Sequence, residues 1–263
     1  MSSRWSRWLS GAVLGAVLLL LYAPVAMIFV YSFNESRIGS VWSGFSVRWY
    51  GELVRDRELW SGLRTSMLVG LAATTLSVAL GTLGALGLRR WRLAPRRAAS
   101  GLFALPLVVP DMIIAVSLAL FFHALGARQG LATVVLAHAT FGLAYAFVVM
   151  SGAVHDFDDT LIDAALDAGA TPWQALRYVT LPILAPSLAV AWLLVFSLSF
   201  DDFLITFLTK GPGADTLPIT IYSRMRFGVT PATNALFVVL FLLTMLGALL
   251  AGWLTRRRFA AFV

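Results

Sequence analysis

Long apolar runs without a single charge are the feature that most constrains this chain. Residues 8–34 and 65–88 contain 27 and 24 consecutive residues without Asp, Glu, Lys or Arg. An α-helix needs about 20 apolar residues to cross the hydrocarbon core of a bilayer. Because the bilayer offers no water to the backbone, runs of this length are expected to satisfy their own hydrogen bonds as helices. The sequence therefore predicts an integral membrane protein.

Six such spans can be placed along the chain, and the arginines between them indicate their direction. The predicted spans are residues 8–34, 65–88, 98–125, a segment within 129–155, 183–208 and 232–254. Five arginines lie within residues 89–97 and three more at 256–258, and basic clusters at span ends mark the cytoplasmic side. We predict an all-α membrane protein with six transmembrane helices and both termini cytoplasmic. Residues 1–263 are expected to form one membrane domain.

Composition excludes several classes of protein. With 59% hydrophobic and 13% charged residues, the chain leaves no length for a separate soluble domain. The absence of cysteine excludes disulfides, thiol catalysis and cysteine-ligated metals. The net charge of +7 arises at span ends, so nucleic-acid binding is not expected. No Gly-x-x-x-x-Gly-Lys-Ser/Thr phosphate loop is present, so the chain is expected not to be an enzyme that hydrolyses ATP.

The segment between the fourth and fifth predicted spans carries helix-ending and helix-starting signals side by side. Gly169 suits the left-handed conformation that ends a helix. Thr171 is a suitable N-cap, Pro172 suits the first helical position, and Gln174 lies where a capping box places its glutamine. The pattern predicts two short helices separated by a break.

This segment resembles the signature cytoplasmic loop of ABC-importer permease subunits, written E-A-A, three residues, G, nine residues, I, any residue, L-P. Asp163 stands where the family usually has Glu, and Val179 where it usually has Ile. The resemblance implies the type I ABC importer permease fold, with a core region at 60–255 and a coupling loop at 151–182 that docks on a separate dimer of ATP-binding subunits. The alternative is an amphipathic surface helix. The matched coupling-loop residues are Asp163, Ala164, Ala165, Gly169, Leu181 and Pro182.

Three aspartates lie inside predicted spans, where an ionisable group costs several kcal/mol unless it faces water or a partner. Asp111 lies 13 residues after Ala98, and Asp201, followed by Asp202, lies 18 residues after Ile183. At 1.5 Å per residue these positions are roughly 20 to 27 Å from the inner surface, in the outer half of the bilayer. The three carboxylates are expected to line one externally facing vestibule.

The surroundings of the aspartate pair suit a cationic permeant. Phe200 and Phe203 flank the pair, and aromatic faces attract ammonium groups when water is partly excluded. No lysine or arginine lies in the third or fifth predicted span. Two alternatives stay open: Asp201 or Asp202 lies at an interfacial helix end, or pairs with a residue of another subunit.

Two further stretches resemble the spermidine/putrescine branch of ABC permeases. They are Ser199-Phe200-Asp201-Asp202-Phe203 followed by Gly211-Pro212-Gly213, and the segment 42–50 of the first external loop. The resemblance implies polyamine transport, with a putrescine-type permease as the narrower expectation. It implies a bacterial inner-membrane location in contact with lipid, a second permease subunit forming a heterodimer and a periplasmic substrate-binding protein. No cofactor is expected on this chain, and ATP with magnesium is expected on the partner ATPase.

Other functions remain as alternatives. Related branches carry iron, thiamine or other compounds, so another small solute is the nearest alternative. An ion-coupled secondary transporter would use the three aspartates as proton relays, but it would leave the coupling loop unexplained. An intramembrane enzyme would use the Asp-Asp pair to hold Mg²⁺, but such sites need a second acidic cluster. His123, His138 and His155 lack metal-ligand spacing, so we expect no metal site and assign them to polar packing or span ends.

Overall fold

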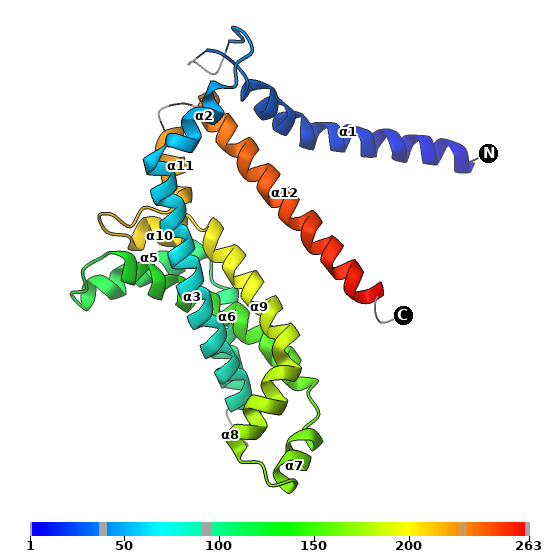
Figure 1. The fold of residues 1–263 in the computed structure, drawn as a ribbon, viewed down its shortest axis with the longest axis vertical. Helices are drawn as coiled ribbons and strands as arrows, with labels where there is room; N and C mark the ends of the chain where they lie inside the picture. The colour runs from blue at the N-terminus through cyan, green and yellow to red at the C-terminus, as the bar shows by residue number, and fades with distance from the viewer. Residues whose placement is uncertain (1, 37–40, 91–95, 227, 229, 261–263) are drawn as a thin grey trace. The chain divides into compact units, whose positions relative to one another are not determined.

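The computed structural model describes residues 2–36, 41–90, 96–226, 228 and 230–260. These residues are almost entirely helical (Figure 1). Trp91 to Pro95 of the arginine-rich loop lies outside the described residues. The long helices are α1 (Ser2–Tyr31), α3 (Arg57–Arg90), α6 (Leu131–His155), α9 (Leu181–Asp201) and α12 (Pro231–Ala260).

Shorter helices connect the long ones. In chain order they are α2 (Arg48–Arg55), α4 (Arg96–Ala104), the 3₁₀ turn η1 (Leu105–Leu107), α5 (Asp111–Ala124), α7 (Thr160–Asp167), α8 (Pro172–Ala175), the π-helical turn η2 (Leu176–Thr180), α10 (Leu204–Thr209) and α11 (Leu217–Met225).

Four helical segments among the described residues are long and apolar enough to cross a membrane. They are Trp8–Tyr31, Arg57–Arg89, Leu131–His155 and Pro172–Asp201. The bent pair Ala98–Leu107 and Asp111–Ala124 gives a fifth if it counts as one span, and α12 contains a shorter apolar stretch, Pro231–Leu246. The chain is therefore a multi-pass membrane protein.

Two predicted spans differ in shape from straight helices. The third is bent by 103° between its two halves, at the segment that holds Pro106 and Pro110. Each proline lacks the N–H that would continue the helix, which explains why the span bends here. The fifth helix ends at Asp201, not at Leu208, because Asp202 adopts an extended backbone.

The chain divides into two compact units, Met1–Leu59 with Ile221–Val263, and Trp60–Thr220. In the second unit α3, α6 and α9 pack together, and small residues let the backbones approach (Figure 1). A Cβ on Gly81 of α3 would lie 2.8 Å from the backbone nitrogen of Phe147 on α6. The hydroxyl of Ser77 donates to the carbonyl of Ala139 at 3.0 Å, which adds a hydrogen bond between the same helices. That the whole chain forms a single domain stays a prediction.

In the first unit, the residues after α1 fold around a buried asparagine. Asn34 is fully buried, its Nδ2 donates to the carbonyl of Val41 at 2.7 Å, and its Oδ1 accepts from the Ser43 N–H at 3.0 Å. The indole of Trp49 on α2 donates to the Asn34 carbonyl at 2.7 Å. These bonds replace those that the chain loses where α1 ends.

An ion pair in the same unit joins the α2–α3 corner to the end of α11. The guanidinium of Arg224 donates to both carboxylate oxygens of Asp56, at 2.6 and 2.9 Å, and to Glu58 at 3.0 Å. The hydrogen bond from Arg224 lowers the pKa of the Asp56 carboxyl below its usual value, against a smaller opposing effect of burial. A bidentate pair of this kind is stronger than most exposed ion pairs.

We expect Asp56→Asn to lower the free energy of unfolding by about 1 kcal/mol at about pH 7, because the pair with Arg224 is lost. The pKa of Asp56 is lowered in the folded state, so its contribution is fully present above the unfolded value of 3.8 and is lost as the pH falls through the lower folded value. The difference between variant and wild type should therefore be constant down to about pH 4. Thermal unfolding in detergent across this range measures it.

The matched control is Glu52→Gln on α2. Glu52 is exposed, and its carboxylate forms no hydrogen bond or ion pair with any residue that the structure describes. A difference between Asp56→Asn and wild type that already narrows between about pH 7 and 5 would contradict the assignment.

Candidate functional site

The segment between α6 and α9 has the capping structure that its sequence predicts. Helix α7 ends at Asp167, and Gly169 follows with a φ of +88°, a conformation that residues with a Cβ rarely adopt. The Thr171 N–H donates to the Gln174 side chain at 2.7 Å, and the Gln174 N–H donates to the Thr171 hydroxyl at 3.3 Å. The predicted break and capping box are both confirmed.

The second short helix, however, is not separate from the fifth span. Helix α8 passes through one π-helical turn, η2, directly into α9, so Pro172–Asp201 forms one helical segment. The N–H of Leu181 donates to the carbonyl of Leu176, five residues earlier. Pro182 has no N–H and its ring crowds the carbonyl four residues before it, and a widened turn relieves both problems. The α7–α8 turn is therefore attached directly to one continuous helix that ends at Asp201.

The predicted coupling residues fall into two groups in the structure. Asp163 and Ala164 are exposed on α7, whereas Ala165 is half-buried, and Gly169 is exposed in the turn. Leu181 and Pro182 begin α9, after η2, and do not share the α7 surface. The carboxylate of Asp163 forms no hydrogen bond or ion pair within the described part of the chain. It is therefore open to a group from outside this chain.

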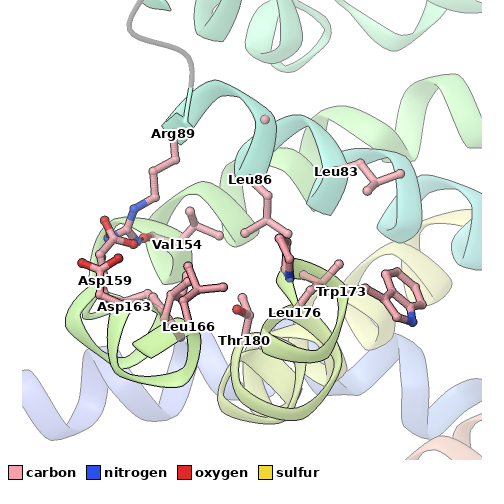
Figure 2. Close-up of a pocket in the computed structure, with 14 residues that line it drawn as sticks. Leu83, Leu86, Arg89, Val154, Asp159, Asp163, Leu166, Trp173, Leu176 and Thr180 are labelled. Atoms are coloured by element: carbon pink, nitrogen blue, oxygen red, sulfur yellow. Dashed lines mark hydrogen bonds and ion pairs between the residues drawn. The ribbon is translucent and has the colours of Figure 1, made fainter. Parts of the chain in front are cut away.

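A cavity of about 850 Å³ lies between the end of α3 and the α7–α8 turn (Figure 2). Leu83 and Leu86 face it from α3, and Leu166 and Trp173 face it from the other side. The charged residues that line it are Arg89, Asp159 and Asp163. No α7 residue is fully buried, so α7 packs only partly against the helices around the cavity.

At the other end of α9, Asp202 is held by the chain itself. Its carboxylate accepts hydrogen bonds from the N–H of Ile205 at 3.3 Å and from the N–H and hydroxyl of Thr206 at 2.9 and 3.1 Å. These contacts satisfy N–H groups at the start of α10. The side chain is only 13% exposed. Asp202 therefore stabilises the break between α9 and α10.

A histidine from α6 contacts this break, although no sequence pattern pairs it with Asp202. His138 is buried, and its Nε2 lies 3.2 Å from the Asp202 carboxylate and 2.9 Å from the Thr206 hydroxyl. Its Nδ1 lies 2.7 Å from the Ser199 hydroxyl on α9. One imidazole thus contacts residues on both sides of the break. We call His138, Ser199, Asp202 and Thr206 the histidine network.

Asp201 has a different environment from its neighbour. It is the last residue of α9, is exposed, and has no hydrogen-bond or ion-pair partner among the described residues. The rings of Phe200 and Phe196 stack along the last turn of α9, and those of Phe203 and Phe207 stack along α10. An exposed carboxylate at the negative end of a helix, beside aromatic rings, is an attractive position for a cation.

Asp111 begins α5, immediately after the bend in the third span. The depth expected from a straight helix does not apply, because the two halves of that span differ in direction by 103°. Helix α5 packs against α10, and Ala115 and Phe122 of α5 share a buried cluster with Ile205. The bend therefore brings the helix that carries Asp111 against the helix that follows the aspartate pair.

The other two histidines show no comparable structure. His123 and His155 are exposed, and the described residues contain no group of three or more His, Asp or Glu side chains arranged to hold a metal. The sequence assignment of His138 to polar packing was correct in type. It missed the contact with Asp202, which lies 64 residues further along the chain.

Residues 77–259 match the family described as the binding-protein-dependent transport system inner membrane component. The matched region is well over half of the chain and includes α6 to α10. The chain belongs to this family. It is referred to below as the permease.

The permease is similar to characterised polyamine permeases over most of its length. It is 43% identical over 223 residues to the putrescine transport system permease protein PotI of Escherichia coli K12, covering 82% of this chain and 79% of the relative. It is 34% identical over 239 residues to the spermidine/putrescine transport system permease protein PotC of the same strain, covering 91% and 90%. PotC of Haemophilus influenzae is 34% identical over 250 residues, covering 95% and 97%.

Solved structures of ABC importers have the same fold. A chain of a bacterial ABC transporter for the acidic polysaccharide alginate aligns with a TM-score of 0.73 at 17% identity, covering 95% of the permease and 96% of that chain. A chain of the methionine transporter MetNI aligns with a TM-score of 0.59 at 21% identity, covering 81% and 98%. At these identities the likeness establishes the ABC importer permease fold alone.

We expect His138→Ala to lower the free energy of unfolding by about 1 to 3 kcal/mol, because it leaves buried Ser199, Thr206 and Asp202 without one partner each. The matched control is His123→Ala, whose imidazole is exposed and has no hydrogen-bond partner among the described residues. The thermal unfolding midpoint of the purified protein in detergent measures both variants. Equal midpoints for the two alanine variants would contradict a structural role for the histidine network.

Proposed function

We propose that the permease forms half of the translocation pathway of an ATP-driven importer of polyamines in the bacterial inner membrane. The observation that carries this proposal is the 43% identity to the putrescine permease PotI, which extends over 82% of the chain. The exposed Asp201 lies in sequence between two stacked pairs of phenylalanine rings, and this supports the proposal because acid and aromatic groups together suit an ammonium group. In this proposal both termini are cytoplasmic and the chain crosses the membrane six times, with α12 as the sixth span.

The α7–α8 turn is the part of the chain that we assign to energy coupling. Asp163 and Gly169 are exposed there, as contact with an ATP-binding subunit would require. Because α8 continues into α9, a displacement at the turn reaches Asp201 along one helix. ATP and magnesium would bind to the partner ATPase dimer, and this chain would supply no cofactor site. Alternating access would then expose Asp201 to the outside and to the inside in turn.

The remaining partners follow from the same proposal. A second permease subunit would complete the pathway, and a periplasmic protein would deliver the substrate. A structure of the alginate transporter is a complex with a pentasaccharide-bound periplasmic protein, and its chain aligns with the permease at a TM-score of 0.64. This likeness supports an arrangement of that type for the permease.

The direct test is uptake by the assembled transporter in liposomes. The permease would be co-expressed with its neighbouring-gene subunits, and uptake of labelled putrescine and spermidine would be measured with and without ATP. We expect ATP-dependent uptake that unlabelled diamines inhibit. ATP hydrolysis by the assembled transporter without polyamine uptake would indicate that it carries another small solute. Polyamine uptake driven by a proton gradient without ATP would contradict the ABC importer assignment.

Within that assay we expect Asp201→Asn to raise the KM for polyamine about ten-fold, because the carboxylate that faces the cation is neutralised. Asp215→Asn removes a negative charge from the loop between α10 and α11 and is the matched control; its carboxylate is exposed and pairs with Lys210. The two variants should assemble to the same level. Equal KM values for Asp201→Asn and Asp215→Asn would remove Asp201 from the pathway.

Asp201 can also be probed chemically, because the chain contains no cysteine. In an Asp201→Cys variant, a cationic thiol reagent added outside should react, and putrescine should slow the reaction. Failure of putrescine to protect at concentrations well above the raised KM, with normal labelling, would place Asp201 on the surface but outside the substrate route.

A further inference from the structure

Arg89, the penultimate residue of α3, contacts three different segments at the cytoplasmic end of the second unit. Its guanidinium donates to the carbonyl of Val154 in the last turn of α6 and to the carbonyl of Phe157 at 2.6 Å. It also pairs with the carboxylate of Asp159 at 2.7 Å. Asp159 immediately precedes α7, so one side chain joins α3, the end of α6 and the start of α7.

These contacts use the specific geometry of arginine. Its planar fork can donate to several acceptors at once, which a lysine ammonium on a flexible stem cannot reproduce in the same way. The two carbonyls belong to the last turn and exit of α6, where backbone acceptors have no partner within the helix. The guanidinium also lies 5.7 Å from the centre of the Phe157 ring. Arg89 is thus held on one side by α6 and on the other by Asp159.

The cavity of about 850 Å³ separates α3 from α7 and α8, with Leu86 on one wall and Leu166 on the other. Arg89 and Asp159 lie at its edge, and Figure 2 shows the Arg89 side chain reaching toward Asp159. The side chain of Arg89 is 21% exposed and that of Asp159 is 62% exposed. The ion pair therefore connects the end of α3 to the start of α7 beside this cavity.

We propose that Arg89 is a positioning residue that makes α3 and α7 move together when the α7–α8 turn is displaced. This inference rests on the proposed function, because it assigns Arg89 a part in transmitting movement from the ATPase. Displacement of the α7–α8 turn moves α9 through α8, and it moves α3 through the ion pair between Asp159 and Arg89. The ion pair gives the turn a second connection to the membrane helices.

A purely structural role for Arg89 makes different predictions. If it served only to cap α6, loss of Asp159 would have no functional effect, since the carbonyl contacts would remain. An exposed ion pair contributes little to stability, so Asp159→Asn should leave folding and assembly intact. The variant Asp159→Asn therefore separates transmission of movement from capping.

The first measurement is the distance between spin labels on cysteines placed at Gly87 on α3 and Ala168 after α7. Both positions are exposed, a Cβ at position 87 meets no atom within 4 Å, and the chain has no other cysteine. In wild type we expect one narrow distance distribution with and without ATP. In Asp159→Asn and Arg89→Gln we expect a broadened distribution. Equal distributions in wild type and both variants would overturn the proposal.

The second measurement is the amount of polyamine taken up per ATP hydrolysed by the assembled transporter. We expect Asp159→Asn and Arg89→Gln to lower this ratio by about five-fold or more. Asp159→Glu and Arg89→Lys, which keep the charges, should restore part of it. A ratio in Asp159→Asn equal to that of wild type would also overturn the proposal.

Asp156→Asn is the matched control. Asp156 lies three residues from Asp159 and is exposed, and its carboxylate has no hydrogen-bond or ion-pair partner among the described residues. It should behave as wild type in both measurements. If wild type itself fails to import polyamine, the proposed function fails, and the spin-label distances still decide whether Arg89 joins α3 to α7.

Discussion

Backbone polar groups inside a bilayer need partners within the protein, and this constraint explains where the permease departs from straight helices. At the α9–α10 break, the Asp202 carboxylate accepts from the N–H groups of Ile205 and Thr206, and His138 fixes the carboxylate. At the end of α6, the guanidinium of Arg89 donates hydrogen bonds to two backbone carbonyls. At these two points a side chain from another helix takes part, His138 of α6 at the first and Arg89 of α3 at the second.

The two aspartates at the end of α9 are adjacent in sequence and differ in environment. Asp202 turns inward and is bound by the histidine network, whereas Asp201 ends the helix exposed and without a partner among the described residues. A buried, fully satisfied carboxylate specifies structure, and an unpaired carboxylate near the end of a membrane helix can receive a cation. The break at Asp202 therefore places Asp201 where we assign the substrate route.

One helical segment connects the α7–α8 turn to the end of α9. Because η2 joins α8 to α9 without interruption, the turn that contains Gly169 and Thr171 is attached to the helix that ends at Asp201. The π-helical turn tolerates Pro182 while keeping the helix continuous. A transporter that couples a cytoplasmic event to an external site benefits from such a continuous element.

Local sequence signals determined the helices and the capping of the α7–α8 turn. The charge-free run at 65–88 lies within α3, and Gly169, Thr171 and Gln174 form the expected turn, because each signal depends on neighbours a few residues away. Only the tertiary structure decided that His138 binds Asp202, that Arg89 binds Asp159, and that the third span bends by 103°. These features depend on contacts between residues 64 and 70 positions apart, or on the direction of a helix after its break, and neither quantity is encoded in local propensity.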